Sequence, residues 1–192
     1  MKIGILVGSF APVHLAHIDM AEKCMAEFDL DKIMFLPSSD PPHKKNITKK
    51  EIRIEMLEKA LEKFPRFYLS TLETERAGKT YTFDTALWLK ENTKDQYFYI
   101  IGGDSLNTLH SWYRADELFK LIEFIVVDRQ HVEEDGTLAE KMGAKIHFSK
   151  HTGLDISSTE VRNKVLNNES IKDLVPSGVM EIIEKYGLYK NL

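Results

Sequence analysis

The stretch Ile3-Gly4-Ile5-Leu6-Val7-Gly8-Ser9-Phe10-Ala11-Pro12-Val13-His14-Leu15-Ala16-His17 lies at the start of the chain and predicts its fold. The first five residues form an apolar run with the length of a buried strand. Gly8 ends this run, because glycine permits a sharp turn and the close approach of a ligand. Pro12 prevents the turn from continuing as a strand. From Leu15 the apolar residues are spaced for one face of a helix, at Ile18, Ala21, Met25 and Phe28.

A strand, a glycine turn and a helix in this order present backbone N–H groups at the helix start, which suits phosphate. His14 and His17 are three residues apart, so both side chains project from one side of the first helical turn. The alternative is an ordinary turn with two solvent-exposed histidines. The ordered combination of strand, Gly-Ser turn, proline and paired histidines favours a binding site.

This stretch resembles the signature of the nucleotidyltransferase superfamily whose motif reads HxGH. The surrounding residues are most similar to the nicotinate-mononucleotide adenylyltransferases, in which the motif usually reads GGTFDPxHxGH. Val7, Ala11 and Ala16 depart from that form. Ala16 adds a methyl group close to where the resemblance puts the nucleotide.

The composition of the 192-residue chain is that of a globular protein, with 43% hydrophobic and 29% charged residues. A net charge of −4 provides no basic field for nucleic acid or an anionic membrane. The sequence has no apolar run of membrane-spanning length and no signal-peptide layout. Cys24 is the only cysteine, so no internal disulfide can form, and its place in the helical pattern predicts a core residue rather than a nucleophile. We expect a cytoplasmic protein.

Short apolar runs alternate with helical patterns along the chain, which predicts an α/β fold with a mainly parallel sheet covered on both faces. The runs lie at 32–36, 66–69, 96–101 and 124–127, with a further edge strand at 144–148. The resemblance implies a Rossmann-like fold with a small C-terminal helical part. We expect a single domain over residues 1–192, in which residues from about 157 form that helical appendage.

Two helix starts are predicted from capping residues. Thr48 is expected to cap a helix that runs to about Lys63, with Glu51 completing a capping box. Thr82 or Asp84 is expected to cap the helix that follows Tyr81.

The loop at 37–45 is rich in proline and cannot be a helix or a central strand. His43, Lys44 and Lys45 could reach a phosphate there, and a solvated basic loop is the alternative. A PPHK segment follows the second strand in the family, which implies that Lys44 binds the phosphate of the acceptor.

The segment Tyr81-Thr82-Phe83-Asp84-Thr85 matches the family's YTxDT, whose helix start helps to hold a pyridine nucleotide. The resemblance therefore implies that Tyr81, Thr82 and Thr85 bind the acceptor. It also implies that Trp112 stacks on the pyridine ring, although a tryptophan is often a plain core residue.

Two further segments are implied to bind ATP. Gly102-Gly103-Asp104-Ser105-Leu106 resembles the family's GADxL, which assigns Gly102 and Asp104 to the nucleotide, with a plain strand-to-helix turn as the alternative. Ile156-Ser157-Ser158-Thr159 and Arg162 match SSTxxR, in which the arginine contacts the ATP phosphates. Helix capping by Ser157 or Ser158 explains the serines without a ligand.

The implied reaction is adenylyl transfer from ATP to nicotinate mononucleotide, giving deamido-NAD and pyrophosphate. Mg²⁺ is expected to travel with ATP, and no carboxylate cluster near the motifs indicates a permanent metal site. The catalytic residues are expected to be His14, His17 and Arg162. The ATP-binding set adds Gly8, Ser9, Phe10, Gly102, Asp104, Ile156, Ser157, Ser158 and Thr159.

Alternatives of two kinds stay open. The acceptor could be nicotinamide mononucleotide or phosphopantetheine, with the same chemistry. The protein could also be a nucleotide-binding regulator without turnover, since Val7, Ala11 and Ala16 depart from the family's motif. The sequence does not predict an oligomeric state.

Overall fold

The computed structural model describes residues 1–39, 48–76, 78–128 and 136–190. The strands are β1 (Lys2–Gly8), β2 (Lys32–Pro37), β3 (Phe67–Leu69), β4 (Gln96–Gly102), β5 (Glu123–Asp128) and β6 (Ile146–Thr152). The helices are α1 (Leu15–Glu27), α2 (Lys50–Leu61), α3 (Thr82–Asn92), α4 (Gly103–Leu106), the 3-10 turn η1 (Leu109–Ser111), α5 (Ala115–Leu118), α6 (Thr137–Lys141), α7 (Ser158–Leu166) and α8 (Ser177–Lys185).

The six strands form one sheet in the order β3-β2-β1-β4-β5-β6, and every neighbouring pair is parallel. This confirms the predicted Rossmann-like α/β fold and the edge position of the last strand. The chain moves outward from β1 to β3 and then returns to place β4 on the other side of β1. Ligands of such sheets bind beyond the carboxyl ends of the strands at the point of reversal.

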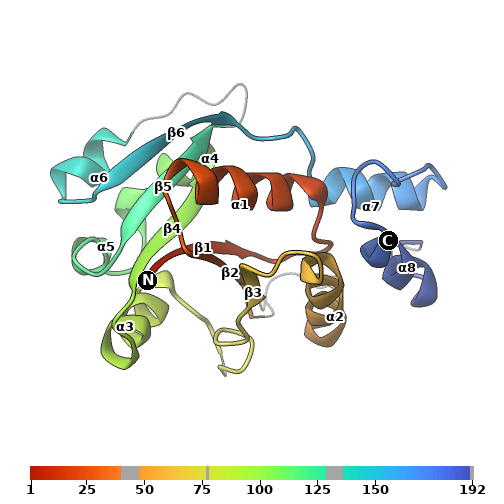
Figure 1. Ribbon diagram of the computed structural model, residues 1–192, viewed down its shortest axis with the longest axis horizontal. Coiled ribbons are helices and arrows are strands. Elements are labelled where there is room, and N and C mark those ends of the chain that lie inside the picture. Colours follow the sequence, from red (N-terminus) through yellow and green to blue (C-terminus); the bar gives the residue numbers. More distant parts are fainter. Residues whose placement is uncertain (40–47, 77, 129–135, 191–192) are drawn as a thin grey trace.

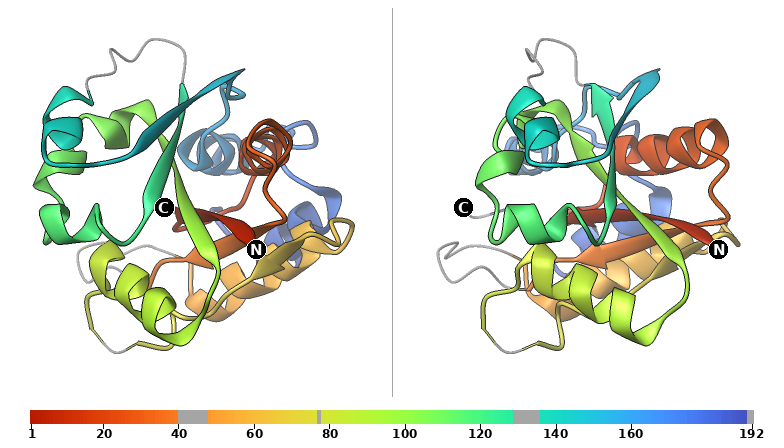
Figure 2. Two further views of the ribbon diagram at one scale, coloured as in Figure 1. Left: turned by 60° about the vertical axis from the view of Figure 1, so that its left-hand side comes forward. Right: turned by 90° about the vertical axis from the view of Figure 1, so that its left-hand side faces the viewer.

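Helices cover both faces of the sheet, with α1 and α3 on opposite sides of it (Figures 1 and 2). One buried cluster joins α1, α2, α7 and α8 to their face of the sheet, and a second joins α3, α4, α5 and α6 to the other face. In β1, Ile5 belongs to the second cluster and Leu6 to the first, as expected for alternating side chains of a strand buried on both faces.

Tight packing explains why β1 contains a glycine at its centre. A Cβ atom at Gly4 would lie 2.8 Å from the side chain of Ile33 and 2.9 Å from that of Leu30. Only a residue without a side chain leaves these two groups in place. Cys24 of α1 is fully buried in the same cluster, and burial raises the pKa of its thiol to about 12, which confirms the predicted core role.

The C-terminal helices pack onto the sheet through the first buried cluster. Val161 of α7 and Val179, Ile182 and Ile183 of α8 are buried there together with residues of α1 and α2. The Leu15 N–H donates to the Leu174 carbonyl at 2.9 Å, so the start of α1 is bonded to the segment between α7 and α8. Across the described ranges of the chain, no helix has both the length and the apolar character needed to cross a membrane.

Two predicted helix caps are wrong. Helix α2 begins at Lys50 with Lys49 at the capping position, and no side chain caps it. The hydroxyl of Thr48 instead hydrogen-bonds the hydroxyl of Tyr189, 2.8 Å away. Neither Thr82 nor Asp84 caps α3, because the helix already begins at Thr82 and Tyr81 occupies the capping position.

Candidate active site

A buried arginine hydrogen-bonds the turn that follows β1. Arg53 of α2 is fully buried, and its Nη1 donates to the carbonyls of Ser9, at 2.8 Å, and Ser38, at 3.0 Å. The Ser38 N–H in turn donates to the Gly8 carbonyl at 2.9 Å. The loops that leave β1 and β2 are therefore fixed to each other at the carboxyl edge of the sheet.

Phe10 shapes this turn with its side chain in the core. Its φ of 47° is in the left-handed region, and the residue is 1% exposed. The ring centroid lies 5.8 Å from that of Phe35 and 5.0 Å from that of His17. The predicted ATP-binding role of Phe10 therefore does not involve its ring, which faces the protein interior.

The two predicted histidines stack on each other at the start of α1. Their ring centroids are 3.7 Å apart with an interplanar angle of 29°. The backbone N–H of His14 donates to Nδ1 of His17 at 3.2 Å. A neutral His17 ring that accepts at Nδ1 carries its proton on Nε2, so Nε2 is the ring nitrogen able to donate. His14 is 2% exposed and His17 is half-buried, so His17 is the more accessible of the pair.

The start of α7 docks directly against the histidine turn. The Ser158 hydroxyl donates to the Pro12 carbonyl at 2.9 Å, and Arg162 Nη1 donates to the Ala11 carbonyl at 2.8 Å. Arg162 Nη2 also donates to the hydroxyl of Thr159 at 3.0 Å. The structure thus brings together two motifs that are far apart in sequence, and these contacts use only two of the five guanidinium N–H donors.

Ser157 caps α7, as predicted. Its hydroxyl oxygen accepts a hydrogen bond from the Glu160 N–H at 3.1 Å. The side chains of Ser157 and Thr159 are exposed, whereas Ile156 packs on the first buried cluster. The exposed start of α7 therefore presents backbone N–H groups and hydroxyls beside the histidine turn.

Gly102 and Asp104 lie at the end of β4, the strand next to β1. Leu6 of β1 pairs with Ile100 of β4, so the two strands reach the same edge and end close together. Asp104 is exposed in the first turn of α4. The glycine turns after β1 and β4 therefore flank the point where the strand order reverses.

A pocket of about 260 Å³ collects three of the four described residues predicted to bind the acceptor. It is lined by Thr80, Tyr81, Thr82, Trp112 and Tyr113. The ring centroids of Tyr81 and Tyr113 lie 4.4 Å apart, and the rings of Trp112 and Phe124 pack in a T-shaped arrangement with their centroids 6.3 Å apart. An aromatic pocket beside the N-terminus of α3 has the character needed for a flat ring that carries an anionic group.

Thr85 differs from the other predicted acceptor residues, because it is fully buried and does not line the pocket. Its hydroxyl donates to Glu73 at 2.9 Å. Lys44, predicted to bind the acceptor phosphate, lies outside the described residues together with His43 and Lys45.

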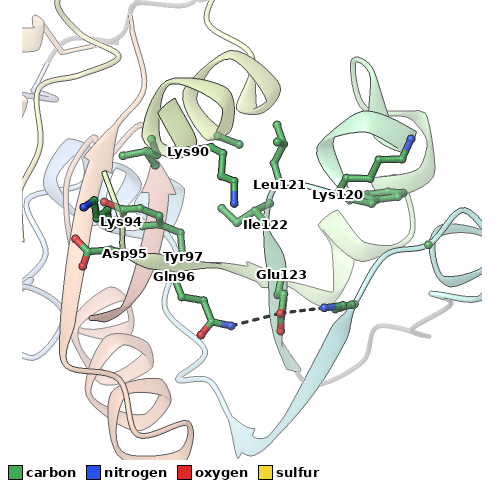
Figure 3. A pocket seen from close by; sticks show the side chains of 14 residues that line it. Lys90, Lys94, Asp95, Gln96, Tyr97, Lys120, Leu121, Ile122 and Glu123 are labelled. Atoms are coloured by element: carbon green, nitrogen blue, oxygen red, sulfur yellow. Dashed lines mark hydrogen bonds and ion pairs between the residues drawn. The ribbon is translucent and has the colours of Figure 1, made fainter. Parts of the chain in front are cut away.

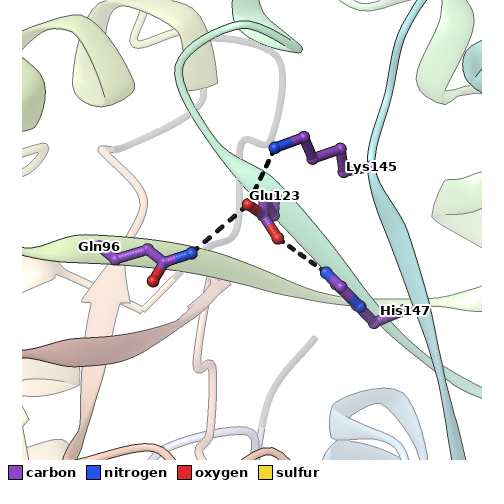
Figure 4. A network of polar contacts seen from close by, with 4 residues as sticks. All are labelled: Gln96, Glu123, Lys145 and His147. Atoms are coloured by element: carbon purple, nitrogen blue, oxygen red, sulfur yellow. Dashed lines mark hydrogen bonds and ion pairs between the residues drawn. The ribbon is translucent and has the colours of Figure 1, made fainter.

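A larger cavity of about 440 Å³ lies at the opposite edge of the sheet, where β4 and β5 begin (Figure 3). Lys90, Lys94, Lys120 and Lys145 are among its lining residues. Beside it, Glu123 accepts hydrogen bonds from His147 at 2.8 Å and from Lys145 and Gln96 at 3.4 Å each (Figure 4). No residue predicted to belong to the site lines this cavity, so size alone does not identify the functional edge.

Sequence reasoning missed three residues at the functional edge. Tyr113 and Thr80 line the aromatic pocket, and each is a direct neighbour of a predicted residue in the chain. Arg53 continues the inner face of α2 that Met56, Leu57 and Ala60 form, and a charged residue in phase with an apolar face was the signal that could have identified it. In the described parts of the chain, no three His, Cys, Asp or Glu side chains form a group that could hold a metal ion.

Two departures from the family's usual motif are buried. Ala16 is 5% exposed and Ala11 is 4% exposed, so their methyl groups add to the packing of the turn and of α1. Val7 packs against the second buried cluster.

Comparison with known proteins identifies the family. The cytidylyltransferase-like family model matches residues 5–164. The chain is 39% identical to the nicotinate-nucleotide adenylyltransferase of Bacillus subtilis over 99% of both chains. It is 37% identical to a probable nicotinate-nucleotide adenylyltransferase of Lactiplantibacillus plantarum over 99% of this chain and 89% of that protein.

The fold is shared with a solved structure. The chain resembles Plasmodium falciparum nicotinic acid mononucleotide adenylyltransferase in complex with NaAD, with a TM-score of 0.83, 22% identity and coverage of 98% of this chain and 97% of that one. The sheet order, the docked histidine and arginine motifs and these likenesses agree. The chain belongs to the cytidylyltransferase-like family, and within it to the nicotinate-nucleotide adenylyltransferases.

Proposed function

We propose that this protein transfers the adenylyl group of ATP to nicotinate mononucleotide. A phosphate oxygen of the mononucleotide attacks the α-phosphorus of ATP, the bond from that phosphorus to the β-phosphate bridging oxygen breaks, and pyrophosphate leaves. The product is deamido-NAD. No side-chain nucleophile is required, so the protein acts by aligning the two substrates and offsetting the charge that develops.

The observation that carries this proposal is the contact between the start of α7 and the histidine turn. Arg162 and Ser158 donate to the carbonyls of Ala11 and Pro12, so cationic and backbone donors from two helix starts face one region. We assign His17 and His14 to the α-phosphate and Arg162 with the 157–159 turn to the departing phosphates. Gly8, Ser9, Phe10, Gly102, Asp104 and Ile156 form the rest of the ATP surface.

The aromatic pocket is our candidate for the pyridine ring of the acceptor. Trp112 supplies a stacking face, and the first turn of α3 supplies backbone N–H groups and the positive end of the helix dipole for the carboxylate. Tyr81 and Thr82 line the same pocket, and Thr85 acts on it from within the helix. Lys44 is retained as the candidate for the acceptor phosphate.

The substrates define the setting of the reaction. Mg²⁺ enters as part of the ATP complex, since free triphosphate carries charge that the two helix starts alone do not neutralise. We place the activity in the cytoplasm, because both substrates are charged nucleotides. We treat the chain as a single domain, and the burial of α7 and α8 in the same cluster as α1 and α2 supports this.

A pyrophosphate-release assay tests the proposal. The protein is mixed with ATP, Mg²⁺ and one acceptor at a time: nicotinate mononucleotide, nicotinamide mononucleotide or phosphopantetheine. Release that depends on nicotinate mononucleotide, with deamido-NAD detected as the product, is the expected result. If the protein binds ATP but releases no pyrophosphate with any of the three acceptors, it is a nucleotide-binding regulator. If pyrophosphate is released only with phosphopantetheine, the protein acts on a different class of substrate.

A further inference from the structure

The reaction as proposed leaves one buried carboxylate without a role. Glu73 lies in the turn after β3 and is 4% exposed. Burial raises the pKa of Glu73, while hydrogen bonds from Thr85 and Thr80 and the charge of Arg76 oppose that rise. An unpaired carboxylate is costly to bury, so the structure retains Glu73 only together with its donors.

The contacts of Glu73 reach both sides of the start of α3. The Thr85 hydroxyl donates to Oε1 at 2.9 Å, and the Thr80 hydroxyl donates to Oε2 at 3.4 Å. Thr80 precedes the first helical residue, Thr82, by two positions, and Thr85 lies one turn into the helix. Arg76 adds a long contact to the Asp84 carbonyl at 3.4 Å. One carboxylate therefore fixes the chain on both sides of the helix start.

This helix start forms one wall of the aromatic pocket. Thr80 and Thr82 line it, and the Asp84 N–H already donates to the Tyr81 carbonyl at 3.0 Å. The N–H groups of the turn that precede Asp84 have no intrahelical carbonyl to reach. Their direction depends on how firmly the residues around them are held. The Ser39 hydroxyl, 3.2 Å from that of Thr80, extends the same network to the loop that follows β2.

We propose that Glu73 is a positioning residue for the carboxylate of the acceptor. It holds Thr80 and Thr85 so that the free N–H groups of the first turn of α3 point at the carboxylate of a nicotinate ring on Trp112. This role rests on the proposed function, because it concerns the same pocket. It predicts that Glu73 acts on acceptor affinity and on selectivity between acid and amide, and has little effect on ATP.

The test compares four single variants and one double variant with the unmodified protein by calorimetric binding of nicotinate mononucleotide, nicotinamide mononucleotide and ATP. Glu73→Leu removes both carboxylate oxygens that accept hydrogen bonds, and Glu73→Gln keeps one oxygen that can do so. Thr85→Val removes the closer donor. Glu75→Gln is the matched control, because Glu75 lies two residues away, is exposed, and accepts a hydrogen bond from the nearby Thr71 hydroxyl at 2.6 Å. Melting temperatures and kcat and KM are measured in parallel.

We expect Glu73→Leu to weaken nicotinate mononucleotide about tenfold or more, the size of one lost charge-assisted hydrogen bond. The affinities for nicotinamide mononucleotide and for ATP should each change by less than about threefold. The ratio of the affinity for nicotinate mononucleotide to that for nicotinamide mononucleotide therefore falls. Glu73→Gln should recover most of the affinity and Glu75→Gln should retain all of it. Thr85→Val combined with Glu73→Leu should weaken binding little more than Glu73→Leu alone, because both substitutions remove the hydrogen bond between Thr85 and Glu73.

Three results would overturn the role of Glu73: unchanged acceptor affinity in Glu73→Leu, equal losses for both mononucleotides and ATP, or failure of Glu73→Gln to recover selectivity while it melts normally. If Glu73→Leu does not fold, Glu73→Gln and Thr85→Val decide the question through the acid-to-amide ratio. If the unmodified protein binds the acceptor but releases no pyrophosphate, the proposed function is contradicted. The binding data would still test the role of Glu73.

Discussion

We expect His17 to be the side chain that acts most directly in the proposed reaction. Its Nδ1 accepts the His14 N–H, which directs the ring proton to Nε2. If Nε2 donates to charge that appears only in the transition state, His17→Ala should lower kcat about 100-fold or more. The affinity for ATP should change much less. Steady-state kinetics combined with ATP binding separates the two effects, and wild-type turnover in the variant would remove His17 from the catalytic set.

Arg162 has a structural contact as well as its proposed ligand. Its bond to the Ala11 carbonyl at 2.8 Å ties α7 to the turn, and its bond to Thr159 fixes the guanidinium plane. We expect Arg162→Ala to weaken ATP binding or turnover and to lower the melting temperature only slightly. Lysine should rescue partly, because it lacks the planar fork of donors. An alanine variant that unfolds readily yet has normal residual kinetics would make Arg162 a purely structural residue.

We expect Trp112 to add contact area for both mononucleotides and little discrimination between them. It is half-buried, its ring lies nearly perpendicular to that of Phe124, and it lines the pocket together with Tyr81 and Tyr113. Stacking on a pyridine ring depends little on whether the ring carries an acid or an amide. Trp112→Ala should therefore raise KM for both mononucleotides by a similar factor. A change confined to one of them would show that the indole takes part in selectivity.

The edge strand β6 is joined to β5 partly by charge. Burial raises the pKa of Glu123, but the hydrogen bond from His147 and the charge of Lys145 outweigh it, and the pKa lies below its usual value. A carboxyl with a lowered pKa in the folded state stabilises the fold above its unfolded pKa, and this contribution is lost as the pH falls through the folded pKa.

Glu123→Gln should therefore lower the free energy of unfolding at neutral pH by up to about 1 kcal/mol, the range for a partly exposed ion pair. The difference from the unmodified protein should vanish as the pH falls through the lowered pKa of Glu123 in the folded state. Thermal unfolding at several pH values measures it, with Glu140→Gln, an exposed glutamate of α6, as the control for loss of one charge. A difference that is constant with pH would contradict the role of charge.

The order of the strands could be predicted from the sequence, and the start of a helix only where the determining contact is local. Ser157 caps α7 because the N–H that it accepts is three residues away. The Thr48 prediction is wrong because its hydroxyl binds Tyr189, which is 141 residues away in the chain. The hydrogen bonds from Arg53 to Ser9 and Ser38 could not be predicted for the same reason. No local sequence pattern indicates which loops an arginine on the inner face of a helix will contact.

The molecule as a whole brings its motifs to one edge because the strand order reverses between β1 and β4. The turn after β1, the turn after β4 and the start of α7 meet there, and the aromatic pocket lies at the start of α3. Motif resemblance could name these segments in advance. It could not predict that Arg162 would contact Ala11, a bond across 151 residues of chain.

Selectivity for the acid form of the acceptor is the central prediction from this arrangement. No lysine or arginine lies between Tyr81 and Leu89, so this segment supplies no cationic side chain at the start of α3. We therefore expect backbone N–H groups and the helix dipole to recognise the nicotinate carboxylate, and an amide N–H₂ would meet donors where it needs acceptors. A mismatch of this kind leaves buried polar groups unpaired.

The most direct measurement is kcat/KM of the unmodified protein for nicotinate and nicotinamide mononucleotides, at fixed ATP and Mg²⁺, with dinucleotide formation as the signal. The arrangement predicts a preference for the acid of about 100-fold or more. Equal values for the two mononucleotides would contradict an acid-selective adenylyltransferase, even if adenylyl transfer itself occurred.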